Sequence, residues 1–393
     1  MGDDPDTARR ANAEGLAALR NGDLAAAVRA FAAATAADPG AGPLWRNLAH
    51  AHRLGGDTTG ERAALTRALE IDRTDFAAQL RMAQLLQRTG EELAALRAWS
   101  ATIALASQIP QLGAGAAAEV ADGQAYVAAL QQRVEVAGKE ALAGLALDET
   151  EQRRLRALTD LALGKRQVFH NQCTGLHYPF LPADEFFDSR HFPWFAELEA
   201  GVGAIRSELE ALLAAGDDVL RPYVRLDEGT PENLWSRLDG SLDWGACFLW
   251  EYGVPNGPII ERCPQTAALL DRLPLQRIPG RAPNAFFSLL RPGKDIPPHT
   301  GVTNTRAIVH LALDVPSDCG FRVGGETREW VQGKAFAFDD TIEHEAWNRS
   351  DRRRAVLILD TWNPHLSKRE REAVIAYFAA SDAAMVGASA GLG

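Results

Sequence analysis

Cysteine is scarce in this chain of 393 residues: four are present, widely separated and without a CxxC pair. Such a distribution provides no disulfide framework and is typical of proteins from a reducing compartment. We therefore expect a cytoplasmic protein. In it Cys173, Cys247, Cys263 and Cys319 would be small buried apolar residues rather than metal ligands.

Long apolar runs and an excess of positive charge are also lacking. No segment approaches the roughly 18 to 20 consecutive apolar residues that a membrane-spanning helix needs. The formal net charge is −11, whereas affinity for phosphate backbones comes from clustered lysine and arginine. We expect neither membrane insertion nor nucleic-acid binding, although a locally basic pocket could still bind an acidic small molecule.

The length predicts two or three domains, each able to bury a core of its own. The first of them repeats itself every 34 positions. Three glycines, each followed by an acidic residue, and three large apolar residues recur at this spacing. They are Gly22, Gly56 and Gly90, and Phe31, Leu65 and Trp99.

A glycine–acid pair suits the turn between two helices, and a large apolar residue fills the space between stacked units. Residues 8–109 therefore resemble the tetratricopeptide repeat, a helix–turn–helix unit of about 34 residues. The array could bind a peptide or protein partner on its concave face, or it could only pack against and solubilise the next domain. The pattern favours neither alternative.

Helical patterns continue over residues 110–165, which we interpret as a connector. From residue 166 to about 375 aromatics and prolines become frequent, and short β-type segments alternate with glycine, proline and aspartate. Regular short strands with turn signals predict an all-β sandwich or barrel. Helices are expected within it at residues 196–215 and 264–272.

Polar residues recur on one face of the predicted strands 285–290, 305–313 and 354–359. In the second of these, a period of two places Arg306 and His310 on the same face, opposite an apolar one. Such groups are costly to bury without partners. We therefore expect this face to line a pocket.

Two histidines, His299 and His344, lie 45 residues apart at the edges of strand-like segments, and Arg354 follows ten residues later. Neutral imidazoles are suitable Fe(II) ligands, and a site with few protein ligands leaves positions for O2 and a chelating cosubstrate. An arginine on a neighbouring strand can bind a carboxylate in a bidentate manner. The pattern indicates a metal and an acidic ligand in one pocket.

Several short motifs surround these residues. They are His299-Thr300-Gly301, His310-Leu311-Ala312-Leu313, Phe338-Asp339-Asp340, Glu343-His344-Glu345-Ala346-Trp347 and Asp360-Thr361-Trp362-Asn363-Pro364. Together they resemble the aspartyl/asparaginyl β-hydroxylase family over residues 280–365, and more weakly back to residue 167. The resemblance implies an Fe(II)- and 2-oxoglutarate-dependent dioxygenase on a double-stranded β-helix (jelly-roll, cupin-like). A tetratricopeptide region also precedes the catalytic domain in that family.

The resemblance also implies residue roles. His299 and His344 match the iron ligands, and Gly301 stands where other dioxygenases carry a carboxylate ligand, a ligand this family lacks. Arg354 matches the arginine that binds the far carboxylate of 2-oxoglutarate. Further matches to cosubstrate-contacting residues are Ser288, His310 and, more loosely, Trp250. Arg306 matches an arginine near the substrate, but Ile308 replaces a second arginine that vertebrate members carry.

We therefore expect a dioxygenase that hydroxylates an Asp/Asn-type residue or a related small molecule, with release of succinate and CO2. One alternative is a non-catalytic tetratricopeptide scaffold whose β domain senses a metal or 2-oxoglutarate. A zinc hydrolase on the same ligands is less favoured, because no third protein ligand is apparent. Because Ile308 replaces that second arginine, the resemblance leaves the identity of the substrate open.

Overall fold

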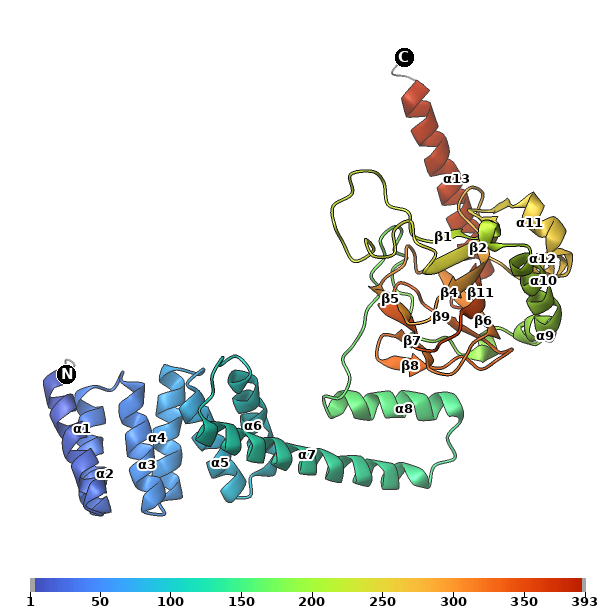
Figure 1. Ribbon diagram of the computed structural model, residues 1–393. Helices are drawn as coiled ribbons and strands as arrows, with labels where there is room; N and C mark the ends of the chain where they lie inside the picture. Colours follow the sequence, from blue (N-terminus) through green and yellow to red (C-terminus); the bar gives the residue numbers. More distant parts are fainter. Residues whose placement is uncertain (1–3, 391–393) are drawn as a thin grey trace. The chain divides into compact units, whose positions relative to one another are not determined.

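The computed structural model describes residues 4–390. The chain forms two compact units, Met1–Leu147 and Asp148–Gly393 (Figure 1). The boundary falls inside the segment 110–165, which we interpreted as a connector. Within the described range, no helix combines the length and the apolar character that crossing a membrane would require.

Six helices form three successive pairs in the first unit. The pairs are α1 (Pro5–Arg20) with α2 (Leu24–Ala37), α3 (Gly42–Leu54) with α4 (Thr58–Ile71), and α5 (Phe76–Arg88) with α6 (Glu92–Ala106). Gly22, Gly56 and Gly90 join the two helices of each pair with φ values of 74°, 73° and 76°. This left-handed conformation is open to glycine without strain. The predicted turns are therefore confirmed.

The acidic residue after each of the first two turns directly precedes the next helix and caps it. The side chains of Asp23 and Asp57 accept hydrogen bonds from the backbone N–H of Ala26 and Gly60, which caps α2 and α4. The three large apolar residues of the repeat are fully buried: Phe31, Leu65 and Trp99. A long helix, α7 (Ala114–Ala143), follows and packs on α6.

The second unit contains two antiparallel sheets. The large sheet has the strand order β1 (Arg221–Pro222), β2 (Trp244–Glu251), β4 (Ala285–Leu290), β11 (Arg354–Trp362), β6 (Arg306–Asp314) and β9 (Ala335–Phe338), and β3 (Val254–Pro255) also pairs with β2. The small sheet has the order β5 (Lys294–His299), β10 (His344–Asn348), β7 (Cys319–Val323) and β8 (Glu326–Arg328). The prediction of a β-rich second half is confirmed at this level, and the double-stranded β-helix remains a prediction.

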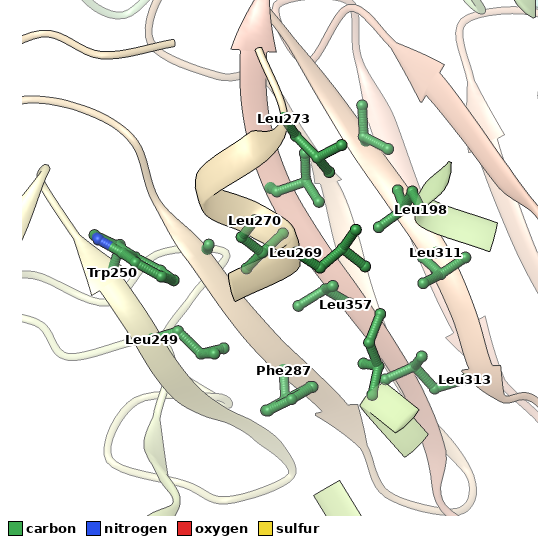
Figure 2. Packing of buried hydrophobic residues seen from close by; sticks show 14 of the residues in the cluster. Leu198, Leu249, Trp250, Leu269, Leu270, Leu273, Phe287, Leu311, Leu313 and Leu357 are labelled. Carbon is green, nitrogen blue, oxygen red and sulfur yellow. The ribbon is translucent and has the colours of Figure 1, made fainter. Parts of the chain in front are cut away.

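Helices cover one face of the large sheet. They are α9 (Phe195–Ala200), α10 (Val202–Ala214), α11 (Gly257–Arg262) and α12 (Pro264–Arg272). Leu198, Leu269 and Leu270 pack there on Leu311 and Leu357 of the central strands (Figure 2). Burying each of these side chains stabilises the unit by about 1.5–3 kcal/mol. The packed helices thereby hold in place the sheet that carries the site. Two further helices, α8 (Glu149–Ala162) and α13 (Lys368–Ala390), also belong to this unit.

The other face of the large sheet turns toward the small sheet. Apolar residues of both sheets form a second core, among them Phe286, Val356 and Ile358 from the large sheet and Phe321 and Ala346 from the small one. The polar residues predicted to line a pocket lie on this face.

Candidate functional site

A cavity of about 490 Å³ is lined by both sheets of the second unit. The lining includes residues predicted from the sequence on β4, β6 and β11 of the large sheet and both candidate metal ligands on the small sheet. They are Ser288; Arg306, Ile308 and His310; Arg354 and Ile358; and His299 and His344. The structure thus brings these sequence-predicted residues to one cavity, as the strand alternation indicated.

His299 and His344 face each other at the paired ends of β5 and β10. Their ring centroids lie 4.0 Å apart. Each Nδ1 lies within hydrogen-bond distance of the carbonyl oxygen two residues earlier, at 2.8 Å from Pro297 O and 3.0 Å from Ile342 O. A carbonyl only accepts, so Nδ1 must carry the proton and donate, and each Nε2 is left with a lone pair.

Burial keeps both imidazoles neutral. It lowers the pKa of His299, and it lowers the pKa of His344 well below its ordinary value, with the neighbouring His299 adding to the effect. Neutral imidazole with a free Nε2 is the form that binds a metal ion. The pair therefore has the tautomer and the charge state of metal ligands.

Arg354 begins β11 and is 1% exposed. Its Nε and Nη1 have no hydrogen-bond partner among residues 4–390. Burial lowers the pKa of this guanidinium to about 10. A buried cation without a carboxylate partner is costly, so the site is suited to an anionic ligand.

His310 and Ser288 lie on the strands that flank β11. His310 is 5% exposed, and in the described part of the chain its Nδ1 has no partner. Burial, and secondarily Arg354, lowers the pKa of His310 well below its ordinary value. The Ser288 hydroxyl accepts a hydrogen bond of 3.0 Å from Trp244 Nε1. The strands that flank the arginine thus carry a neutral imidazole and a hydroxyl.

Trp250 differs from its predicted position. The cavity lining includes Trp244 and Phe248 of β2, whereas Trp250 is buried in the helix-covered core. The register of β2 shifts between Phe248 and Trp250. This irregularity interrupts the alternation of side chains, so that Trp250 points to the opposite face. Trp244 is the tryptophan of this strand that reaches the cavity, and we correct the assignment accordingly.

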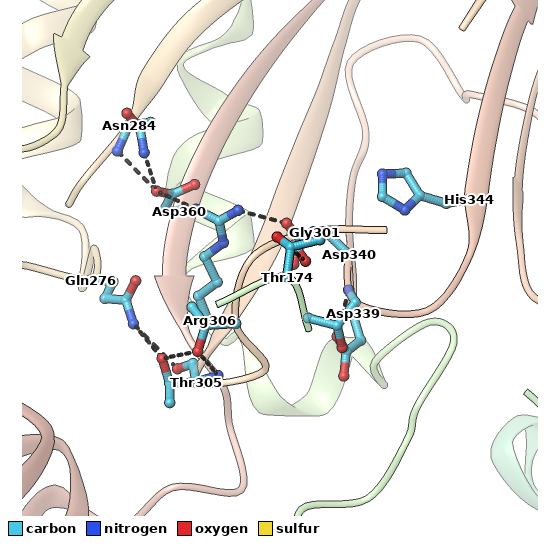
Figure 3. A network of polar contacts seen from close by, with 12 residues as sticks. Thr174, Gln276, Asn284, Gly301, Thr305, Arg306, Asp339, Asp340, His344 and Asp360 are labelled. Atoms are coloured by element: carbon cyan, nitrogen blue, oxygen red, sulfur yellow. Dashed lines mark hydrogen bonds and ion pairs between the residues drawn. The ribbon is translucent and has the colours of Figure 1, made fainter. Parts of the chain in front are cut away.

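Arg306 lines the cavity, but two carboxylates already hold its charge (Figure 3). Nη2 lies 2.6 Å from Asp340 Oδ2 and Nη1 lies 3.4 Å from Asp360 Oδ2. Asp360 in turn accepts hydrogen bonds from the backbone and side-chain amides of Asn284. Burial acts against the charge of Arg306, but the two carboxylates outweigh it and raise its pKa. The predicted substrate arginine is therefore part of a closed ionic network.

Asp340 is the residue whose role the sequence did not reveal, although it belongs to a quoted motif. It is 5% exposed, and its Oδ1 has no hydrogen-bond partner within the described range. A Cβ added to Gly301 would lie less than 3.0 Å from this carboxylate. The space beside His299 that a side chain at position 301 would enter is thus occupied by an acid from another segment.

Residues 199–364 match the model of the family described as Aspartyl/Asparaginyl beta-hydroxylase. This segment of the chain is similar to that family. An ornithine lipid ester-linked acyl 2-hydroxylase from Rhizobium tropici is 37% identical over 192 residues, which is 48% of this chain and 64% of that protein. The human aspartyl/asparaginyl beta-hydroxylase is 36% identical over 191 residues, 46% of this chain and 24% of that protein. The chain therefore spans less than two thirds of these relatives.

Solved tetratricopeptide structures are similar to the first unit only at a low level. The Sgt2 domain from Aspergillus fumigatus covers 38% of this chain and 91% of its own, with 15% identity and a TM-score of 0.29. The assignment of the repeats rests instead on the 34-residue spacing and the three helix pairs.

Proposed function

We propose that the second unit is an Fe(II)- and 2-oxoglutarate-dependent hydroxylase that releases succinate and CO2. One observation carries the proposal: a single cavity joins two neutral histidines with free Nε2 atoms to a buried arginine that lacks a carboxylate partner. The similarity of residues 199–364 to a β-hydroxylase family supports hydroxylation. The metal, the cosubstrate and the substrate are our inferences.

The donor set suits Fe(II). His299 and His344 would supply two nitrogen ligands, and both are held in the correct tautomer by backbone carbonyls. Among residues 4–390 no cluster of three or more His, Cys, Asp or Glu side chains forms a metal site. A two-ligand site leaves positions for a chelating oxo acid and O2, whereas zinc enzymes rely on three protein ligands.

2-Oxoglutarate would place its far carboxylate against Arg354, because Nε and Nη1 of that guanidinium need acceptors. Ser288 and His310 would lie beside the same carboxylate. Iron with 2-oxoglutarate would supply the O2 activation that hydroxylates a C–H bond. The protein's part is to position both groups and, with Phe286, Phe321 and other apolar side chains, to exclude water.

The charged residues that line the cavity restrict which charge the substrate can carry near the reacting carbon. Arg306 is held by two carboxylates, Arg221 is paired with Glu251, and Ile308 adds an apolar surface. Arg225 lines the exposed rim of the cavity and has no carboxylate partner in the described part of the chain. We infer that the group next to the reacting carbon is uncharged, and that an anionic group would bind further out.

This inference bears on the two kinds of substrate named for the relatives. One relative is an aspartyl/asparaginyl hydroxylase and another is an acyl hydroxylase of an ornithine lipid. Without a free cation beside Ile308, an asparagine-type or acyl acceptor fits this cavity better than an aspartate carboxylate. We further propose that the repeat array contributes a peptide- or protein-binding surface.

Calorimetry without oxygen, followed by succinate detection in air, tests the proposal. We expect 2-oxoglutarate to bind only in the presence of Fe(II) or Mn(II), and His299→Ala and His344→Ala to abolish metal binding. His50→Ala, on α3 of the other unit, is the matched control. Binding without any succinate across a substrate panel would favour the sensor alternative. No metal-dependent binding at all would exclude both.

A further inference from the structure

Trp330 lies behind the two residues that we propose to hold the far carboxylate of 2-oxoglutarate. It belongs to the segment between β8 and β9, is 7% exposed, and is not among the described residues that line the cavity. The guanidinium carbon of Arg354 lies 5.0 Å from the centroid of its ring. The His310 ring is nearly parallel to it, at 11° and 6.1 Å between centroids.

Among the described residues, no recorded hydrogen bond or ion pair holds the guanidinium of Arg354. Its Nε and Nη1 have no hydrogen-bond partner among the described residues, and no salt bridge to a carboxylate is found for it there. Hydrogen bonds normally set the plane and the position of an arginine head group. For Arg354, the face of Trp330 is the contact available to do so, since tryptophan is the aromatic residue that attracts a cation most strongly.

The indole N–H does not explain why Trp330 is present. Nε1 is buried and, in the described part of the chain, has no acceptor. A buried donor without a partner is unfavourable by about 1–3 kcal/mol. Phenylalanine would avoid that loss, but its smaller ring attracts a cation less strongly. The chain therefore retains the larger ring despite an unsatisfied N–H.

We propose that Trp330 is a positioning residue: its ring holds Arg354 and His310 ready for the far carboxylate of a 2-oxo acid. The inference rests on the proposed function and adds to it the means by which the cavity selects a dicarboxylate. A guanidinium fixed before binding loses little freedom when the carboxylate arrives. With the ring removed, Arg354 would be free to turn away, and the advantage of the second carboxylate would be lost.

The test compares two oxo acids of equal chain length. 2-Oxoglutarate carries the far carboxylate, and 2-oxovalerate has a methyl group in its place. Their dissociation constants are measured by calorimetry, directly or in competition, with Mn(II) and without oxygen. In Trp330→Leu we expect 2-oxoglutarate to bind about tenfold to thirtyfold more weakly. Binding of 2-oxovalerate should stay within about twofold, because only the far carboxylate uses Arg354.

Two further variants separate the ring from other effects. Trp330→Phe keeps an aromatic face without the N–H, so it should fall between the wild type and Trp330→Leu. Phe287→Leu shrinks a buried ring in the helix-covered core and should leave the ratio of the two dissociation constants unchanged. If Trp330→Leu does not fold, Trp330→Met fills more of the space and provides the same comparison.

The outcomes are distinct. Equal weakening of both oxo acids in Trp330→Leu would mean that the ring only supports the fold, and the inference would be wrong. Equal weakening of 2-oxoglutarate binding in Trp330→Phe and Trp330→Leu would assign the effect to the N–H and also overturn it. If the wild type binds no 2-oxoglutarate, the proposed function itself fails. A wild type that binds it, with unchanged ratios in every variant, refutes only the role of Trp330.

Discussion

The carboxylate of Asp340 occupies the space into which a side chain on Gly301 would project. By the family resemblance, position 301 is where other dioxygenases carry a carboxylate as their third protein ligand. Here the same volume is filled by an acid that is bound to Arg306 at 2.6 Å. A carboxylate side chain at position 301 would therefore collide with Asp340, so the glycine is required by packing.

Gly301→Asp should consequently fail to create a third metal ligand. We expect it to lower the free energy of unfolding by roughly 1–3 kcal/mol, as overpacking of a buried site does, without tighter metal binding. Denaturant titration and metal competition measure the two effects. Gly203→Asp is a control, since a Cβ there meets nothing within 4 Å. Adding Asp340→Gly should recover stability, and a stable Gly301→Asp that binds metal more tightly would contradict this account.

Arg354→Met should stabilise the protein while weakening its proposed function. Replacing a buried charge by an apolar side chain of similar volume stabilises by about 1–4 kcal/mol where the charge lacks compensation. Loss of the charge-assisted hydrogen bonds should weaken 2-oxoglutarate binding at least about tenfold. Thermal unfolding and calorimetry test the two expectations. Arg352→Met removes an exposed pair with Asp314 and should change stability by less than about 1 kcal/mol. A destabilised Arg354→Met would show that the charge is compensated.

Period-two alternation explains why much of the site was predictable. The pairing of β4 with β11 has no register shift, and that of β6 with β11 shifts only between Ala355 and Val356, so Ser288, His310 and Arg354 still fall on the lining face as the sequence pattern indicates. The 34-residue spacing likewise predicts the three helix pairs, because each unit needs its glycine turn and its large buried residue.

The positions of Trp250, Arg306 and Trp330 could not be predicted from the sequence, because they depend on contacts and irregularities that sequence periodicity does not show. One irregularity in β2 sends Trp250 to the other face. The pairing of Arg306 with Asp340 and Asp360 joins residues from three separate segments. Trp330 comes from a connection between strands, where no period applies. Long-range contacts and a local break in register, rather than composition, decide these positions.

Acid should destabilise the metal-free protein partly through His310. Burial lowers its pKa well below 6.5, and the charged group that faces it, Arg354 on β11, acts in the same direction. Below pH 6.5 the unfolded chain binds a proton at this position that the folded protein does not, so stability is lost as the pH falls. Between pH 7.5 and 5.0 this histidine contributes at most about 2 kcal/mol to that loss, which is the limit for a group of unfolded pKa 6.5 that stays neutral in the folded protein.

His310→Gln isolates that contribution, because glutamine does not titrate. The drop in the free energy of unfolding between the two pH values should be smaller in the variant, by at most about 2 kcal/mol. Asp339, whose pKa burial raises to about 7, acts with the opposite sign but is present in both proteins and cancels. Urea titrations at the two pH values measure the difference. An equal drop in both proteins would show that His310 is protonated in the folded state.

Substitution of two glycines on α7 tests whether this helix is held against α6, the last helix of the repeat array, by its contact with Trp99. A Cβ on Gly123 would lie less than 3.0 Å from the ring of Trp99, whereas a Cβ on Gly138 would meet nothing within 4 Å. Gly123→Ala should therefore separate α7 from α6 and destabilise the first unit by about 1–3 kcal/mol. Gly138→Ala should stabilise α7 by about 0.5–1 kcal/mol, because alanine favours helix where glycine does not. Hydrogen exchange of α6 and α7 would report both changes. The same response from the two variants would mean that α7 does not depend on its contact with Trp99.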